Sequence, residues 1–284
     1  MTILLHFSDT HFGTEIPAVI AALHRQMATM PIDGIILSGD LTQRARLHQF
    51  RDCRAFIDAF GKAPLLATPG NHDISLWCPW ERLFTPYRRY QKYFPTAFDR
   101  YGVIRVQMGG VYILGVRTTR RYRHIHGELS EAQIDRVGRL LQEAPANALK
   151  LVVCHQPLYV TDKEDEVDLI RGAAKALPVW RAAGADGIIS GHIHQPFLVP
   201  IPPGQDSLSP RPLWAIQNGT TTSRRLRDNY PNTFNSISNE QPALAAGGEI
   251  HNPLGLAQPS WLAIQWLYDD KTAQFLPSEQ YWIK

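Results

Sequence analysis

The sequence is poor in cysteine. Its 284 residues include three cysteines, Cys53, Cys78 and Cys154, and no C-x-x-C pair. An odd number of cysteines without paired spacing argues against a disulfide framework. We therefore expect a protein of a reducing compartment and predict a cytoplasmic location.

Long hydrophobic runs and a strong charge of one sign are also absent. The apolar run within residues 1–8 is too short for a signal sequence and leads directly into Asp9, so we expect neither a secretory segment nor a membrane span. The formal net charge is only +3, which makes nucleic acid an unlikely partner. With 44% hydrophobic residues the chain can bury one large core, and we expect a single domain over residues 1–284.

Short apolar runs alternate with helical patterns through the first 190 residues. We expect strands at 3–7, 34–37, 65–67, 111–114, 149–154, 187–189, 213–216, 261–268 and near Phe275, and helices at 17–30, 47–60, 130–141 and 179–183. Ser130 to Gln133 has the form of a capping box. The proline-rich residues 196–212 predict irregular structure, and residues 228–259 predict a long loop. The alternation indicates an α/β fold with right-handed crossovers.

Five of the expected strands end in side chains that can bind metal or transfer protons. In such sheets ligands gather beyond the carboxyl ends of the strands. Each residue alone has an ordinary interpretation, as a turn residue or as a hydrogen-bonded histidine. Together they indicate one shared site, formed by Asp9, His11, Asp40, Asn71, His72, His155, His192 and His194.

The donor types of this set narrow its chemistry. Carboxylate, amide and imidazole donors without a thiolate suit Mn, Fe, Co or Zn rather than a structural zinc. Seven ligands exceed the needs of one ion and fit two, with a carboxylate bridging them. Such a pair binds a phosphoryl group and generates a hydroxide between the ions. A histidine that is not a ligand can then assist the leaving oxygen.

The same residues resemble the calcineurin-like metallophosphoesterase family, whose pattern is D-x-H, G-D, G-N-H-D/E, H and G-H-x-H. All five blocks occur in order across residues 9–194. The resemblance implies a metal-dependent phosphoric ester hydrolase with two divalent ions and a four-layer α/β/β/α sandwich of two mixed sheets. The blocks are Asp9-Thr10-His11, Gly39-Asp40, Gly70-Asn71-His72-Asp73, His155 and Gly191-His192-Ile193-His194.

The resemblance also implies a role for each residue of the site. One ion would be held by Asp9, His11 and His194, and the other by Asn71, His155 and His192. Asp40 would bridge the two ions. His72 would face the substrate as an acid or charge stabiliser, and Asp73 would support the site from behind.

Within the family the chain looks most like the bacterial cyclic-nucleotide-type phosphodiesterases, because residues 4–13 resemble the corresponding sequence of those enzymes. Cys154-His155-Gln156-Pro157 departs from the His-His-Pro-Pro that many of those relatives have. Gly39-Asp40-Leu41-Thr42 lacks the Asp-Arg-Gly continuation of the protein Ser/Thr phosphatases, which argues against a phosphoprotein substrate.

Three basic segments are candidates for substrate contacts. In residues 74–100 basic and aromatic residues interleave, which indicates either a substrate-rim insertion or an amphipathic helix with a basic face. The segments 120–126 and 220–225 give Arg120, Arg121 and Arg224 as candidate phosphate contacts. A solvated loop is the alternative for the first of these two segments.

These observations lead to one expected function and several alternatives. We expect hydrolysis of a phosphodiester in a small molecule, such as a cyclic nucleotide or a glycerophosphodiester. A phosphomonoesterase or pyrophosphatase acting on a nucleotide or lipid precursor is the alternative. A nuclease would need a long basic track, and a non-catalytic scaffold would be expected to lose His72 or a ligand. A homo-oligomer remains possible, with residues 228–259 as a lid or subunit contact.

Overall fold

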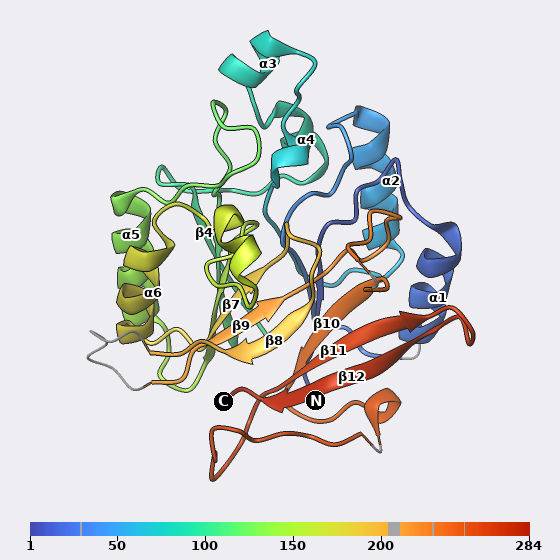
Figure 1. Cartoon of the computed structure of the whole chain (residues 1–284), viewed down its shortest axis with the longest axis vertical. Coiled ribbons are helices and arrows are strands. Elements are labelled where there is room, and N and C mark those ends of the chain that lie inside the picture. The colour runs from blue at the N-terminus through green and yellow to red at the C-terminus, as the bar shows by residue number, and fades with distance from the viewer. Residues whose placement is uncertain (29, 204–210, 229, 247) are drawn as a thin grey trace.

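The computed structural model describes residues 1–28, 30–203, 211–228, 230–246 and 248–284. Two mixed six-stranded sheets pack face to face, and helices cover the outer face of each (Figure 1). This is the expected four-layer arrangement.

The first sheet has the strand order β12-β11-β10-β1-β2-β3. Its parallel half consists of β1 (Ile3–Phe7), β2 (Gly34–Leu37) and β3 (Leu65–Ala67). Its antiparallel half consists of β10 (Thr233–Ser238), β11 (Leu262–Asp269) and β12 (Gln274–Trp282). The C-terminal strands β10, β11 and β12 therefore complete the sheet that contains β1.

The second sheet has the order β4-β5-β6-β7-β9-β8. Four neighbouring strands are parallel, namely β5 (Val111–Val116), β6 (Leu149–Val153), β7 (Gly187–Ser190) and β9 (Trp214–Gln217). The edges are the antiparallel strands β4 (Val103–Met108) and β8 (Phe197–Pro200).

The helices fall into two covering layers and a separate pair. The first sheet is covered by α1 (Pro17–Met27) and α2 (Leu47–Asp58), and the second by α5 (Glu131–Glu143) and α6 (Ala173–Ala182). Two short helices, α3 (Pro79–Phe84) and α4 (Arg88–Tyr93), follow β3. Single 3₁₀ turns occur at Asn71–Asp73, Lys163–Asp168 and Ala243–Ala245. Within the described ranges, no helix has the length and apolar character needed to span a bilayer.

Side-chain alternation along the strands creates three separate cores. On β1, Leu5 and Phe7 face α1 and α2, whereas Leu4 faces the second sheet. On β6, Val152 faces α5 and α6, and Leu151 faces the first sheet. A strand presents successive side chains to opposite faces, so apolar runs buried on both sides define the two central layers.

Several sequence expectations need correction. The proline-rich segment 196–212 is regular over Phe197–Pro200, where β8 lies, while its residues 204–210 lie outside the described residues. The expected loop at 228–259 contains β10, a strand next to β1. Residues 74–100 hold two short helices rather than one amphipathic helix. The capping box is present, with the Ser130 side chain accepting a hydrogen bond from the Gln133 amide.

Candidate metal centre

The eight residues singled out in the sequence follow β1, β2, β3, β6 and β7 at their carboxyl ends. Several have backbones in the left-handed region, which costs a residue other than glycine on the order of 1 kcal/mol or more and persists where function requires it. They are Asp9, His11, Asp40, His192 and His194, with φ between 41° and 77°. At His192 and His194 this geometry breaks the strand pattern, so that side chains two positions apart approach the same site.

Two motif glycines allow the loops to touch. A Cβ on Gly191 would lie 1.8 Å from Ser8 Oγ and 2.2 Å from Asp9 Oδ2. A Cβ on Gly70 would lie 2.1 Å from Asp40 Oδ1 and 2.2 Å from the Asp40 amide nitrogen. The glycines of these blocks are therefore required by the close packing of the loops against the two carboxylates.

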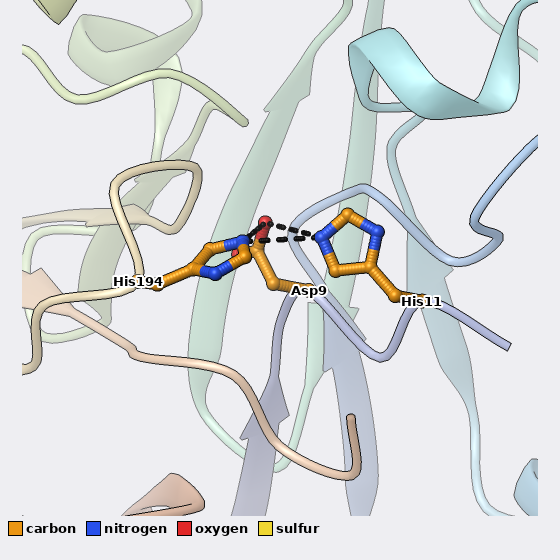
Figure 2. A group of neighbouring side chains, drawn as sticks. All are labelled: Asp9, His11 and His194. Carbon is orange, nitrogen blue, oxygen red and sulfur yellow. Dashed lines mark hydrogen bonds and ion pairs between the residues drawn. The ribbon is translucent and has the colours of Figure 1, made fainter. Parts of the chain in front are cut away.

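The first group of donors consists of Asp9, His11 and His194 (Figure 2). His194 Nε2 lies 3.3 Å from Asp9 Oδ1 and 3.1 Å from His11 Nε2, and His11 Nε2 lies 3.7 Å from the same Asp9 oxygen. Asp9 is buried, and its Oδ1 has no hydrogen-bond partner among the described residues. An orphaned buried carboxylate oxygen facing two imidazole nitrogens is the arrangement expected of a cation site.

The second group consists of Asp40, His155 and His192, with Asn71 beside it. His155 Nε2 lies 3.3 Å from Asp40 Oδ1 and 3.1 Å from Asn71 Oδ1. The other ring nitrogen of His155 lies 2.9 Å from the carbonyl oxygen of Ser38. Because Nδ1 donates to that carbonyl, Nε2 is the ring atom available as a ligand.

Asp40 lies between the two groups. Its Oδ1 faces His155, while its Oδ2 lies 3.7 Å from His11 Nε2. Two ligand atoms that each lie about 2.1 Å from one metal at the tetrahedral angle are about 3.4 Å apart. The donor separations of 3.1–3.7 Å have this length, so the residues present fit two cations that share Asp40.

The pKa directions reflect the same crowding of charge. Burial disfavours ionisation of Asp40, but His155 and His72 outweigh it and hold the Asp40 pKa well below its usual range. Burial lowers the pKa of His155, and the Asp40 carboxylate outweighs burial and raises that pKa to about 9. At His11 burial prevails and holds the pKa well below its usual value. A lowered pKa favours the neutral imidazole of His11, the form that binds metal.

His72 is the most exposed of the five histidines in the set, with 23% of its side chain accessible. Its Nδ1 lies 2.8 Å from the Gln43 carbonyl oxygen, and its Nε2 lies 3.9 Å from Asp40 Oδ2. His11, Asp40 and His72 also lie close enough together to share an ion. The geometry therefore admits His72 either as a ligand or as a group that faces the substrate.

Asp73 is not aimed at the donors but ties the loops together. Its carboxylate accepts hydrogen bonds from the backbone amides of Leu41, Thr42 and Gly70 and from the Thr42 hydroxyl, at 2.9–3.1 Å. These contacts fix the loop after β2 to the loop after β3. Asp73 therefore holds in place the loop that carries Asp40.

A cavity of about 390 Å³ opens beside the donors. The loop after β9 supplies three of its lining residues, Arg225, Leu226 and Arg227. Arg225 Nη1 lies 3.0 Å from Gln43 Oε1 and 3.5 Å from His72 Nε2, and the Arg225 carbonyl lies 2.6 Å from His194 Nδ1. The sequence analysis named Arg224 in this basic segment, and the adjacent Arg225 reaches the site instead.

Arg227 and Asp168 complete the polar lining, and no sequence motif marked them. Arg227 Nη1 lies 2.7 Å from Asp165 Oδ1. Asp168 Oδ1 lies 3.7 Å from His192 Nε2, so it sits beside the ring of that histidine. Asp168 belongs to a 3₁₀ turn far from the five blocks in sequence, and an acidic stretch of this kind would ordinarily be interpreted as a solvated turn.

The three arginines expected to contact substrate lie elsewhere. Arg120 donates to Gln133 Oε1 at 2.5 Å, and Arg121 donates to the Leu83 carbonyl at 2.9 Å. Both line a separate surface cavity of about 490 Å³. Arg224 is exposed. Among the described residues that line the cavity beside Asp40, none of these three occurs.

Among the solved structures that share the fold are two phosphatases. A purple acid phosphatase, PPD1, from yellow lupin (Lupinus luteus) aligns with a TM-score of 0.67 and 11% identity over 99% of this chain and 53% of its own. A dimetal phosphatase from Danio rerio aligns with a TM-score of 0.57 and 12% identity over 83% of this chain and 92% of its own. The chain thus spans about half the length of the lupin protein. No curated protein sequence matches it.

A family profile matches the sequence directly. The profile is that of the calcineurin-like phosphoesterases, and the match runs over residues 3–196. This range is more than half of the chain and contains all five blocks from Asp9 to His194. The chain therefore belongs to the calcineurin-like phosphoesterase family.

Proposed function

We propose that the protein hydrolyses a phosphodiester bond in a small molecule, such as a cyclic nucleotide or a glycerophosphodiester, and that it groups with the bacterial cyclic-nucleotide-type phosphodiesterases. The observation that carries the proposal is Asp40. Its two carboxylate oxygens face different groups of donors, at 3.7 Å from His11 and 3.3 Å from His155. A shared carboxylate between two nitrogen-rich groups is the architecture of a two-metal hydrolase.

The donor residues would divide between two ions. Asp9, His11 and His194 would hold one, Asn71, His155 and His192 the other, and Asp40 would contact both. Nitrogen and oxygen donors without a thiolate suit Mn, Fe, Co or Zn. When bound, such ions supply Lewis acidity toward phosphoryl oxygens and lower the pKa of water.

His72 would move the proton at the leaving oxygen. Because Nδ1 donates to the Gln43 carbonyl, Nε2 is the atom that faces the cavity. A protonated Nε2 can donate to a departing alkoxide, which is general acid catalysis. Arg225 lies 3.5 Å from this nitrogen, so its positive charge would bind the phosphate beside His72.

The volume of the cavity suits a small substrate. At about 390 Å³ it is at the lower end of the range for small-molecule pockets. Its two arginines, Arg225 and Arg227, supply local positive charge for a phosphate. A net charge of +3 over the chain gives little support for the long basic track of a nuclease.

Hydrolysis assays on paired chromogenic substrates test this proposal. We expect turnover of bis(p-nitrophenyl) phosphate with added Mn²⁺, at a higher kcat/KM than for p-nitrophenyl phosphate. A preference for the monoester would replace the diesterase assignment by the phosphomonoesterase or pyrophosphatase alternative. An absence of turnover on both substrates, with each of Mn²⁺, Fe²⁺, Co²⁺ and Zn²⁺, would reject the proposal.

A further inference from the structure

The short helix α3 presents its apolar residues to solvent. Trp80 is 74% exposed, Phe84 67% and Leu83 48%, and Trp77 just before the helix is 77% exposed. Not one of the six residues of α3, all of which the structure describes, is buried. A helix on the surface of a soluble protein normally turns such residues toward the core.

Polar contacts hold α3 in this orientation. Arg82 donates to the carbonyl oxygens of Arg121 and Arg123, at 2.8 and 2.5 Å. Glu81 pairs with Arg89, with Nη2 2.6 Å from Oε2. The charged residues of α3 therefore face the protein while its aromatic residues face outward. These contacts hold the apolar side chains of α3 in solvent. Packing against the core therefore does not explain why they are apolar.

Unpaired positive charge borders the aromatic surface. A cavity of about 610 Å³ next to α3 is lined by Trp80 and Phe84 together with Arg88 and Lys92. Across the described part of the chain, no carboxylate pairs with Arg88 or Lys92, and both are exposed. Apolar walls and cations side by side are complementary to an amphiphilic anion.

The position of α3 suits contact with an extended surface. It lies at one end of the longest axis of the molecule, at the opposite end from β12 (Figure 1). Interfacial helices lie along the bilayer surface and bury their apolar face about 5–10 Å deep, a depth that the exposed side chains of α3 can reach. Tryptophan favours the headgroup level of membranes.

We propose that Trp77 and α3 dock the protein onto an anionic phospholipid bilayer. The aromatic side chains enter the headgroup region, and Arg88 and Lys92 contact lipid phosphates. A second copy of the chain fits this surface less well, because a two-fold contact would bring the same cations against each other. This peripheral docking does not depend on the proposed hydrolysis.

Tryptophan fluorescence and sedimentation with vesicles test the docking. Trp77 and Trp80 are the exposed members of the seven tryptophans, since Trp180, Trp214, Trp261 and Trp266 are buried and Trp282 is partly buried. We expect phosphatidylcholine–phosphatidylglycerol vesicles to shift the emission to shorter wavelength and to sediment the protein. Pure phosphatidylcholine should do so weakly, and salt should weaken the binding.

Substitutions separate the apolar and ionic parts. In the Trp77→Ser/Trp80→Ser variant, sedimentation with anionic vesicles should fall by at least about tenfold. In Arg88→Gln/Lys92→Gln, the dependence on salt should flatten. Leu276→Ser is the matched control, because Leu276 is a 44% exposed apolar residue on β12, and its sedimentation should equal that of the native chain. Thermal unfolding verifies that each variant is folded.

Two results with anionic vesicles would overturn the docking: equal sedimentation of Trp77→Ser/Trp80→Ser and the native chain, or no sedimentation of the native chain. If the native chain stays in solution with vesicles, and analytical ultracentrifugation shows a dimer that the double tryptophan variant converts to a monomer, the surface belongs to a contact with a second copy of the chain.

Discussion

His72 differs from the other histidines of the metal centre in its access to solvent. Its side chain is 23% exposed, whereas those of His11 and His155 are fully buried. Replacing it by alanine should leave the metal content unchanged and lower kcat by about 10²–10⁴-fold, the range of a lost general acid. The measurement pairs hydrolysis of bis(p-nitrophenyl) phosphate with elemental analysis of the purified variant.

The control for His72 is another accessible histidine. His48→Ala, on the exposed side of α2, should retain full activity and metal. Loss of one metal equivalent from His72→Ala would instead make His72 a ligand, a role that its proximity to His11 and Asp40 permits.

Gly191 tests whether the loops need their close packing. In Gly191→Ala the new methyl would overlap Ser8 Oγ and Asp9 Oδ2 and push the Asp9 carboxylate out of line with His11 and His194. We expect a destabilisation of about 1–3 kcal/mol, typical of overpacking, together with weaker metal binding. Urea denaturation and metal titration measure the two effects.

Gly138→Ala is the matched control for that substitution. Gly138 lies inside α5, where a Cβ would meet only Val179 Cγ1, at 3.3 Å. Alanine is favoured over glycine in a helix by roughly 0.8–1 kcal/mol, so this variant should be at least as stable as the native chain. If the two alanine variants lost the same stability, the contact with Asp9 would not be the reason.

At the scale of elements, the loop between β9 and β10 brings Arg225 to His72. Arg225→Ala should lower kcat/KM for the diester by about 10- to 100-fold, as expected for loss of a hydrogen bond to a charged group. Arg224→Ala removes the same charge from the neighbouring exposed position and should change kcat/KM little. Steady-state kinetics on both variants decide between the two arginines, and an equal loss would favour a general effect of charge.

Strand β10 has no apolar run and was not predicted from the sequence. All six residues of β10 are buried, yet four of them are polar, namely Thr233, Asn235, Ser236 and Ser238. Thr233 and Ser236 find hydrogen-bond partners inside the protein, for example Trp266 Nε1, which lies 2.9 Å from Ser236 Oγ. A strand with so few apolar residues cannot be detected from hydrophobic periodicity. Pro200 ends β8, which pairs on one side only, and proline is tolerated on edge strands.

The site was more predictable than the elements around it. Each block places its donors directly after an apolar strand, and three of the five blocks, Gly39-Asp40, Gly70-Asn71 and Gly191-His192, also contain a glycine. These are local properties of sequence. Gly191 before His192 is an example, since its lack of a Cβ admits Asp9. Arg225, Arg227 and Asp168 were missed because their proximity to the donors depends on the path of loops, which no local pattern encodes.

At the scale of the whole molecule, the site joins both sheets. Asp9, Asp40 and Asn71 follow strands of the first sheet, whereas His155, His192 and His194 follow strands of the second. The family match ends at residue 196, but β9 to β12 complete the sheets and deliver Arg225. Each group of donors therefore combines residues from both sheets, and the relative position of the two sheets sets the distances within each group.

Because the donors come from both sheets, we predict that metal binding stabilises the entire fold. The Asp9 and Asp40 carboxylates are almost wholly buried, at 0% and 2% exposure, and buried charges are costly unless compensated. A cation at about 100 times its Kd adds about 2.7 kcal/mol of stability by binding only the folded state. For a chain of this size that corresponds to a rise in Tm of roughly 4–5 °C. Calorimetry after chelation and after addition of Mn²⁺ measures the rise. Asp9→Asn, which keeps the shape and removes the charge, should lose most of it, and an equal rise in both proteins would mean that Mn²⁺ binds elsewhere.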